Sequence, residues 1–312
     1  MPERAGWLVI ALVLDAFWSD KEWLWRQTGR PEEWCRRALA WCEPRWNRGE
    51  PQARRLGGLA TVALIAGGAA AAGWLIEEIA SALPFGALVE IAVVAAFLAQ
   101  ASTAQQIRQV AQDVADGGIA ERVSPVMGEG EPLLRDESEL ARATIEGTAL
   151  GLVTGAAAPV LAYMVFGLSG ILAYTALRLT ALILTREPGV GGEFRWMAEN
   201  AYMVANYVPA RWAALLLVGA AALDQRDWRA AWRAGRHDGP EQVSPNAGWP
   251  QGAMAGALDL RLGDPATHRH GTWLHPDGRR DCGAADIHAA LRLFWLACAV
   301  QGIVAAAIWT FF

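Results

Sequence analysis

The chain has 312 residues, of which 54% are hydrophobic and only 19% are charged, and its formal net charge is -5. Soluble domains contain roughly 45–50% apolar and about 25% charged residues, so this composition favours a membrane protein and excludes a disordered chain. The acidic balance also argues against nucleic-acid binding, because phosphate backbones are bound by basic surfaces. Of the 27 basic residues only Lys21 is a lysine, which excludes a phosphate-binding loop that ends in Lys-Ser or Lys-Thr.

Apolar segments divide the chain into candidate membrane spans, each of which needs roughly 20 mainly apolar residues. The segment 7–18 is expected to remain as a membrane element, because no small-residue cleavage site follows it. Gly167-Leu168-Ser169-Gly170 predicts a tight turn that joins two helices into a hairpin. In chain order, the expected spans are 7–18, 56–76, 84–101, 147–166, 169–185 and 287–312.

The segment 203–223 allows two interpretations. Pro209 and Arg211 interrupt it, and only about a dozen apolar residues follow, too few for a full span. Basic regions favour the cytoplasmic side of a membrane, and the two basic regions 19–55 and 224–285 share that side only if 203–223 does not cross. We therefore favour a re-entrant or interfacial segment over a full span.

Three polar regions separate the apolar segments. Residues 19–55 contain nine basic side chains and five tryptophans, which is typical of a helix that lies among lipid headgroups. Residues 102–146 begin as an amphipathic helix and become acidic around Glu129, and residues 224–285 form the largest polar loop. The sequence thus predicts a single all-α domain over 1–312: a polytopic helical membrane bundle with amphipathic interfacial helices and a large polar loop.

Potential metal ligands show no strong metal-binding spacing. Cys35 and Cys42 lie seven residues apart on one helix face, and the four cysteines of the chain contain no Cys-x-x-Cys pair. We expect buried apolar side chains, with no disulfide framework. The histidines and aspartates of 264–281 match no strong zinc pattern, so a solvated loop is expected there; they are His268, His270, His275, Asp264, Asp277 and Asp281.

Two ionisable residues lie inside apolar segments. A buried carboxylate such as Glu90 is costly in a membrane and usually faces a partner or a cavity. Arg178 is either its counter-charge or a side chain that extends to the nearby interface. Together they raise the hypothesis of a transporter, which the absence of an internal repeat in the sequence disfavours.

Two short motifs are more specific than these single residues. In Asn206-Tyr207-Val208-Pro209-Ala210-Arg211 the proline withdraws a backbone donor, while the Arg211 guanidinium suits a phosphate or carboxylate. In Ser244-Pro245-Asn246-Ala247-Gly248-Trp249-Pro250 two prolines and a glycine predict a rigid turn that displays Ser244 and Asn246. A run of small residues, 252–258, follows and allows close packing; a merely structural turn is the alternative.

The order and separation of these motifs resemble the CobD/CbiB family, the adenosylcobinamide-phosphate synthases of cobalamin biosynthesis. The likeness extends from Leu14-Asp15 through the helix near 105–116, the Ala141–Glu146 string and Ala158-Pro159. The resemblance implies an ATP- and Mg²⁺-dependent ligase that joins adenosylcobyric acid to an aminopropanol phosphate. It further implies that Arg211 holds a phosphate and that Asn206, Ser244, Asn246 and Trp249 bind substrate.

The chain also departs from the family pattern at several polar positions. Gly128-Glu129-Gly130-Glu131 stands where a Gly-Arg-Asp-Thr string is expected, with Arg135-Asp136 displaced downstream. Apolar or small residues replace polar motifs after Glu146 and around Arg178, and Tyr202-Met203 replaces an Asp-Asp pair. Most of the missing groups are oxygen ligands, which a Mg²⁺-dependent ligase needs. Glu146 and Asp136 are then the best remaining catalytic carboxylates, and Glu129 the best remaining metal ligand.

Two functional hypotheses follow from this mixture. The first is a divergent cobalamin-biosynthesis ligase in the inner (cell) membrane, with a corrinoid substrate, the lipid bilayer and other cobalamin-biosynthesis proteins as partners. The second is a catalytically degenerate membrane scaffold or an envelope-sensing protein, because the Arg-containing apolar helix at 176–184 also resembles AmpE-like proteins.

Overall fold

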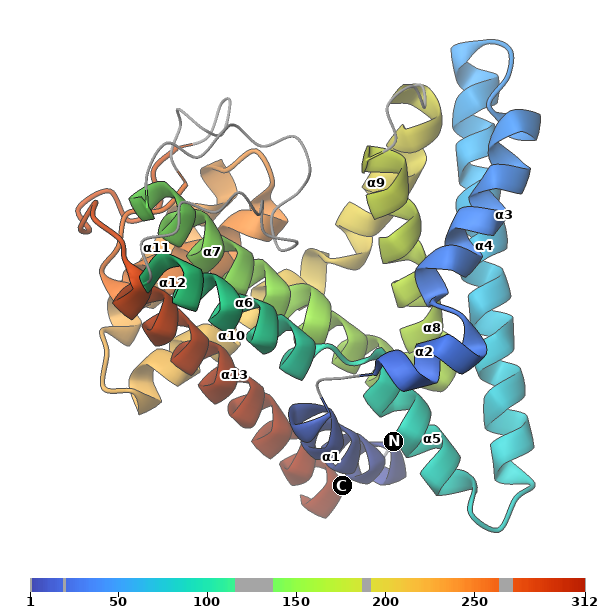
Figure 1. The fold of residues 1–312 in the computed structure, drawn as a ribbon, viewed down its shortest axis with the longest axis horizontal. Helices are drawn as coiled ribbons and strands as arrows, with labels where there is room; N and C mark the ends of the chain where they lie inside the picture. The colour runs from blue at the N-terminus through green and yellow to red at the C-terminus, as the bar shows by residue number, and fades with distance from the viewer. Residues whose placement is uncertain (1, 19–20, 116–136, 187–191, 264–271, 312) are drawn as a thin grey trace. The chain divides into compact units, whose positions relative to one another are not determined.

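The computed structural model describes residues 2–18, 21–115, 137–186, 192–263 and 272–311. In these ranges every regular element is a helix, apart from two isolated β-bridges, which confirms the all-α class (Figure 1). The N-terminal helices are α1 (Pro2–Phe17), α2 (Glu22–Thr28), α3 (Pro31–Trp46), α4 (Pro51–Ser81), α5 (Gly86–Phe97) and α6 (Gln100–Ala115). The remaining helices are α7 (Glu137–Leu152), the π-helix η1 (Val153–Ala157), α8 (Ala158–Arg186), α9 (Gly192–Ala205), α10 (Tyr207–Leu223), α11 (Trp228–His237), the 3₁₀ turn η2 (Gly239–Glu241), α12 (Pro245–Leu258) and α13 (Ala284–Phe311).

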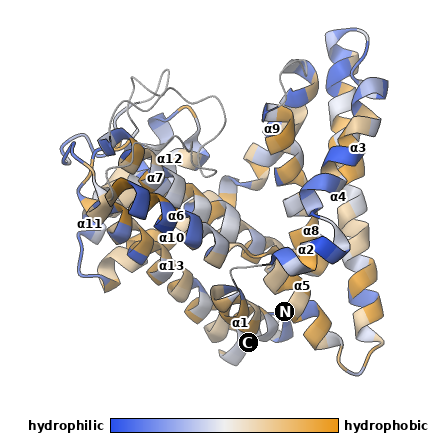
Figure 2. Ribbon diagram, in the orientation of Figure 1, coloured by the Kyte–Doolittle hydropathy of each residue, from blue (hydrophilic) through white to orange (hydrophobic). Residues whose placement is uncertain are grey.

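The described helices confirm a polytopic membrane protein. Four helical stretches are long and apolar enough to cross a membrane, namely 51–81, 86–115, 137–186 and 284–311, and the pair α9–α10 makes a fifth if its two halves form one span. Hydrophobic residues cover much of α4 and α5 (Figure 2), and many large ones on α4 are solvent-exposed in the isolated chain, as lipid-facing residues are. α1 has 16 residues, short of the roughly 20 that a span needs, so a span at 7–18 stays a prediction.

The helices divide into two compact units. Unit 1 comprises 1–98, 159–206 and the last residues from Ile308, and unit 2 comprises 99–158 and 207–307. In unit 1, α4 packs against α3, α5 and α9, while α1 packs against α5. In unit 2, α12 packs against α7, α10 and α11. Whether 1–312 acts as a single domain stays a prediction.

The helix α8 is broken at Gly167, the first residue of the expected Gly167–Gly170 turn. Gly167 adopts φ 66° and ψ -149°, which is far from helical geometry and which only glycine adopts readily. A side chain on Gly170 would collide with the carbonyl oxygen of Ala162, eight residues earlier. In a continuous helix those residues would lie about 12 Å apart along the axis, so the chain folds back at this point.

The cysteines of the structure are free and buried, as the sequence predicts. Cys35 and Cys42 face the interior of unit 1 from α3. Burial raises the pKa of the Cys35 thiol to about 11, so the reactive thiolate is scarce at neutral pH.

The polar regions contain more helix than the sequence analysis expects. Residues 224–285, expected as a polar loop, hold α11 and the mostly buried α12. Their close packing depends on small residues: a side chain on Gly252 would lie 2.7 Å from the carbonyl oxygen of Ala234, and one on Gly256 would meet the backbone of Ala230. The predicted rigid turn at Ser244–Pro250 is likewise the first part of α12, because Pro245 takes the first helical position, where no N–H is needed.

Candidate functional site

The first turn of α10 and the first turn of α12 meet in unit 2 at Arg211. The Arg211 guanidinium donates to the Asn246 side-chain oxygen over 2.9 Å and to the Tyr207 carbonyl over 2.6 Å. Its central carbon lies 3.5 Å from the Tyr207 ring centroid and 5.3 Å from that of Trp249. The structure thus brings together three of the predicted substrate-binding residues, Arg211, Asn246 and Trp249, from two separate motifs.

Backbone packing fixes where α12 begins. Gly239 and Gly248 approach so closely that a side chain on Gly239 would lie 2.9 Å from the backbone of Gly248. Ser244 precedes the helix and its carbonyl accepts bonds from the N–H groups of Ala247 and Gly248. The Ser244 hydroxyl makes no capping bond and the residue is exposed. An exposed hydroxyl and an adjacent guanidinium at the positive end of a helix dipole are suited to an anionic ligand.

Glu146 of α7 is connected to the start of α12 indirectly, through the loop that contains Gly263. It is 6% exposed on α7, and its carboxylate accepts a bond of 2.7 Å from the N–H of Gly263. Gly263 has φ 74°, and a side chain there would lie 3.1 Å from the amide nitrogen of Gln242. The Gln242 side chain in turn packs against Gly248, so one residue bridges the Glu146 loop and the start of α12.

Asn206 is held by a different set of contacts, in unit 1. Its side-chain oxygen accepts from the Tyr174 hydroxyl over 3.0 Å, and its nitrogen donates to the Tyr202 carbonyl over 2.9 Å. The residue is buried and stands between the last residue of α9 and the first residue of α10. These two bonds hold the amide at the helix break, a structural role that the sequence analysis did not foresee.

Comparison with known proteins decides the family. A family profile described as CobD/Cbib protein matches residues 8–294. The chain belongs to the CobD/CbiB family. The cobalamin biosynthesis protein CobD of Brucella anthropi is 35% identical over 317 residues, which cover 96% of this chain and 95% of that protein. A protein of the same name from a Sinorhizobium species is 34% identical over 94% of both chains, and one from Rhodobacter capsulatus is 28% identical over 96% of both. No solved structure matches the chain.

The other two predicted acidic site residues belong to the segment between α6 and α7. Asp136 and Glu129 lie outside the described residues, as do Asp264, His268 and His270. Within the described ranges no group of three His, Cys, Asp or Glu side chains is arranged to hold a metal ion. His275 instead contacts the Asp259 carboxylate over 3.0 Å.

The buried carboxylate Glu90 of this CobD/CbiB-family chain faces a tyrosine. The Tyr163 hydroxyl donates to Glu90 over 2.7 Å within unit 1. Nearby, Glu77 pairs with Arg4 over 3.3 Å and also accepts from the N–H of Leu168, directly after the break in α8. In the described part of the chain, Arg178 does not contact Glu90. The counter-charge role of Arg178 stays a prediction.

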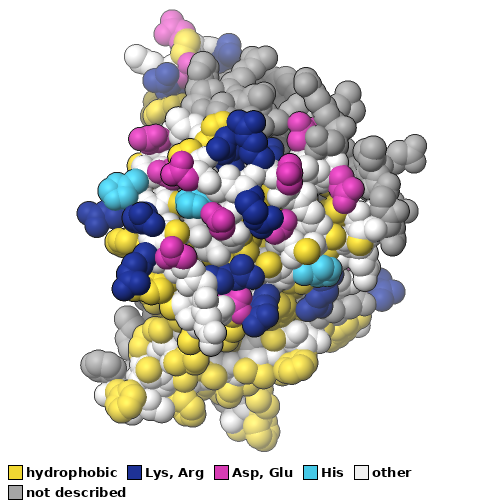
Figure 3. Space-filling model, turned by 90° about the vertical axis from the view of Figure 1, so that its left-hand side faces the viewer, with side chains coloured by type: hydrophobic (Ala, Val, Ile, Leu, Met, Phe, Trp, Pro, Cys, Tyr) yellow, Lys and Arg dark blue, Asp and Glu magenta, His cyan; other side chains and the backbone are white. Residues whose placement is uncertain are grey.

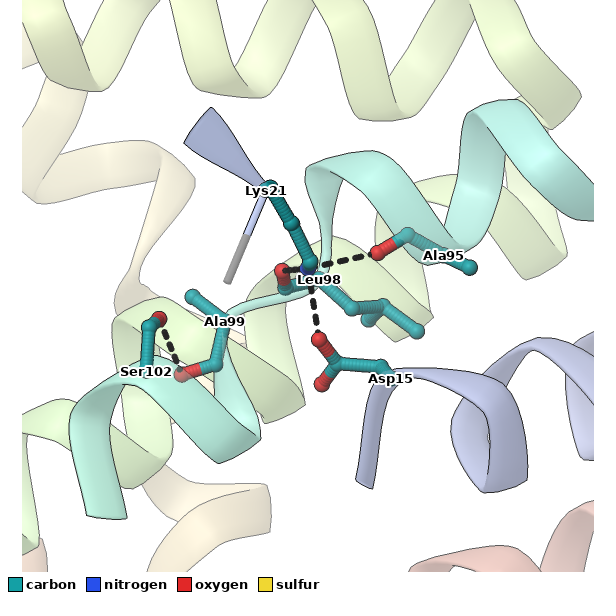
Figure 4. Close-up of polar contacts among 6 residues, drawn as sticks. All are labelled: Asp15, Lys21, Ala95, Leu98, Ala99 and Ser102. Carbon is teal, nitrogen blue, oxygen red and sulfur yellow. Dashed lines mark hydrogen bonds and ion pairs between the residues drawn. The ribbon is translucent and has the colours of Figure 1, made fainter. Parts of the chain in front are cut away.

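Sequence reasoning missed a buried ion pair between Lys21 and Asp15. The Lys21 ammonium donates to the Asp15 carboxylate over 2.6 Å and to the carbonyls of Ala95 and Leu98 over 2.7 and 2.5 Å (Figure 4). Lys21 is 8% exposed and Asp15 is fully buried. Burial lowers the pKa of Lys21, and the neighbouring Asp15 opposes that shift. The available signal was that the chain's only lysine follows an apolar helix that carries an aspartate.

Proposed function

We propose that this chain acts in cobalamin biosynthesis as an adenosylcobinamide-phosphate synthase, which joins adenosylcobyric acid to an aminopropanol phosphate through an amide bond. Family membership and the relatives named as cobalamin biosynthesis proteins support the pathway. One observation connects the proposal to specific residues: Arg211 contacts both Asn246 and Trp249 at the start of α12.

In this proposal the start of α12 binds the phosphate of the aminopropanol substrate. Arg211 supplies a planar guanidinium, which suits the two-point binding of phosphate oxygens. Asn246 accepts from Arg211 and so fixes its direction. The exposed Ser244 hydroxyl offers a further donor, and the helix dipole favours negative charge at this end. Holding the phosphate here would orient the amine toward the activated carboxylate.

Trp249 and Trp232 provide an aromatic wall beside this phosphate site. Their ring centroids lie 6.4 Å apart in an edge-to-face arrangement. Arg211 lies against the Trp249 face, which limits the rotamers that the guanidinium can adopt. The wall thereby keeps the cation in place before substrate binds.

Glu146 is the proposed catalytic carboxylate. Its bond to Gly263 fixes one end of the loop that reaches Gln242 and the start of α12. Magnesium is commonly bound by one or two carboxylates together with substrate phosphates, so a single protein carboxylate is compatible with a Mg²⁺-ATP site. ATP would activate the carboxylate of adenosylcobyric acid, and Asp136 and Glu129 remain proposed contributors.

The cell membrane is the proposed location. The basic regions 19–55 and 224–285 favour the cytoplasmic side, where ATP is available. Residues 224–285 include α11 and α12, so this orientation would expose the start of α12 to a cytoplasmic substrate.

Complementation tests the proposal most directly. The gene is expressed in a strain that lacks its own synthase, with cobyric acid as the corrinoid source and growth as the readout. We expect growth with the unchanged chain and none with Glu146→Gln, although that variant reaches the membrane in equal amount. Glu137→Gln, at an exposed position on the same helix, is the matched control and should support growth.

A purified assay assigns the role of Arg211. Arg211→Gln should lower kcat/KM for aminopropanol phosphate about 10- to 100-fold, since a hydrogen bond to a charged group contributes about 1.5–3 kcal/mol. No growth from the unchanged protein, confirmed in the membrane, would overturn the stand-alone ligase. Growth with Glu146→Gln would favour the alternative of a scaffold that lacks this catalytic group.

A further inference from the structure

The helix α11 presents a basic and aromatic face to solvent. Its other face is formed by small buried residues such as Ala231 and Ala234, which pack against α12. Because a helix has 3.6 residues per turn, Arg229, Arg233 and Arg236 lie along one side, and all three are exposed. Figure 3 shows charged side chains gathered over the side of unit 2 that carries this helix, with hydrophobic side chains below them.

The helix α11 begins close to the end of α10 and to the point where the apolar part of α13 begins. The Asp224 carboxylate, directly after α10, accepts from Arg226 over 2.7 Å and from Arg292 of α13 over 2.6 Å. Beyond Arg292, α13 contains no charged residue up to its last residue. The double ion pair therefore marks the boundary between the apolar and polar parts of both helices, and Trp228 follows it by four residues.

A hollow of about 930 Å³ opens at this boundary. It is lined by Arg226, Trp228, Arg229, Trp232 and Arg233, together with Asp227 and Gln225. The one carboxylate among them caps α11, because it accepts from the backbone N–H groups of Arg229 and Ala230 over 2.9 Å. In the described part of the chain neither Arg229 nor Arg233 reaches a carboxylate within ion-pair distance. The hollow is thus cationic, and the guanidinium groups of Arg229 and Arg233 are available to a ligand, while Arg226 pairs with Asp224.

We propose that this hollow binds the phosphodiester headgroup of an anionic phospholipid. Guanidinium groups bind phosphate oxygens in pairs, and tryptophans with arginines on an amphipathic helix are typical of the membrane interface. Trp228 is 42% exposed, and the Arg229 guanidinium lies 4.7 Å from its ring centroid, so the ring can enter the headgroup layer beside the bound phosphate. The position directly after an apolar helix favours a lipid over a soluble phosphate compound.

Lipid retention by the full chain in neutral detergent tests this inference. Phosphatidylglycerol and phosphatidylcholine with identical acyl chains are added separately, and bound lipid is counted by native mass spectrometry. The unchanged chain should retain phosphatidylglycerol in preference to phosphatidylcholine. Arg229→Gln/Arg233→Gln should weaken phosphatidylglycerol binding roughly 10- to 30-fold, since each interfacial arginine contributes about 1 kcal/mol.

The control variant removes the same charge from another part of unit 2. Arg108→Gln/Arg280→Gln alters two exposed arginines on α6 and on the segment before α13, and it should retain phosphatidylglycerol. Arg229→Lys/Arg233→Lys keeps both charges and should retain most of the binding, which separates loss of charge from loss of fold. Equal retention of both lipids, equal loss in both glutamine variants, or displacement of phosphatidylglycerol by ATP would overturn the proposal. None of these readouts depends on ligase activity.

Discussion

The buried carboxylates Glu90 of unit 1 and Glu146 of unit 2 have different contacts, and the difference separates a structural group from a candidate functional one. In unit 1 the buried charged residues contact side chains of other elements: Lys21 binds Asp15, and Glu90 binds Tyr163. In unit 2 the buried carboxylate Glu146 binds a backbone N–H in a loop that leads to the start of α12. A membrane interior requires internal partners for polar groups, which accounts for the contacts of unit 1 without catalysis.

The units also differ in what holds their helices together. One core cluster of unit 1 contains large apolar side chains such as Phe194 and Leu184. The core of unit 2 is rich in alanine, and α11 and α12 are close enough that glycine backbones touch. Glycine also allows close packing in unit 1, where a side chain on Gly58 of α4 would meet the carbonyl oxygen of Phe194. Gain of side-chain volume should therefore destabilise either unit, and unit 1 should in addition be sensitive to the loss of a polar partner.

The largest effect is expected from Lys21→Met in unit 1. The change leaves the Asp15 carboxylate buried without its ammonium and removes the donor to two carbonyls. Breaking a buried ion pair on one side costs about 3–5 kcal/mol. Denaturation of the detergent-solubilised protein, followed by circular dichroism, measures the free energy of unfolding.

A double variant sharpens this prediction. Burial lowers the pKa of Lys21, which indicates that desolvation outweighs the attraction of Asp15. Replacing both partners with apolar residues, Lys21→Met/Asp15→Leu, should therefore recover much of the stability lost in the single variant. If Lys21→Met alone changes the unfolding free energy by less than about 1 kcal/mol, the pair is not the structural element described above.

A smaller effect is expected from Gly252→Ala in unit 2. The new methyl group would meet the carbonyl oxygen of Ala234 at 2.7 Å and its carbonyl carbon at 2.9 Å, and these are backbone atoms that must shift. Overpacking of this kind costs about 1–3 kcal/mol. Gly302→Ala on α13, where nothing lies within 4 Å, is the matched control and should be neutral or stabilising, because alanine favours helix. Equal thermal stability of the two variants would contradict the close packing of α11 and α12.

The parts of the structure that sequence predicts are those that depend on local pattern. Long apolar runs predict the spans, since bilayer thickness sets their length, and the two glycines around Leu168 predict the break in α8. The motif residues Arg211, Asn246 and Trp249 were grouped through family resemblance, and the structure brings them together.

The parts that sequence missed depend on contacts between distant segments. Lys21 binds carbonyls 74 and 77 residues away, and no local pattern encodes that pairing. The start of α12 was interpreted as a turn because it holds two prolines, yet Pro245 occupies a position that needs no N–H. Packing against α7, α10 and α11 compensates for the donor that Pro250 lacks inside the helix.

The smallest effect is expected at Asp227, the residue that begins α11. Its carboxylate caps two backbone N–H groups, chiefly that of Ala230, and these bonds lower the pKa of Asp227. A carboxyl group with a lowered pKa in the folded state stabilises the fold above its unfolded pKa of about 3.9, and this contribution disappears as pH falls through the folded value.

Asp227→Ala should therefore lower the melting temperature slightly at pH 7, and the difference from the unchanged chain should shrink below about pH 4. Asp227→Asn retains a capping side chain and should melt close to the unchanged protein at pH 7. A difference that persists undiminished at low pH would contradict a contribution from the ionised carboxylate and would attribute the effect to a property of the side chain that does not depend on its charge.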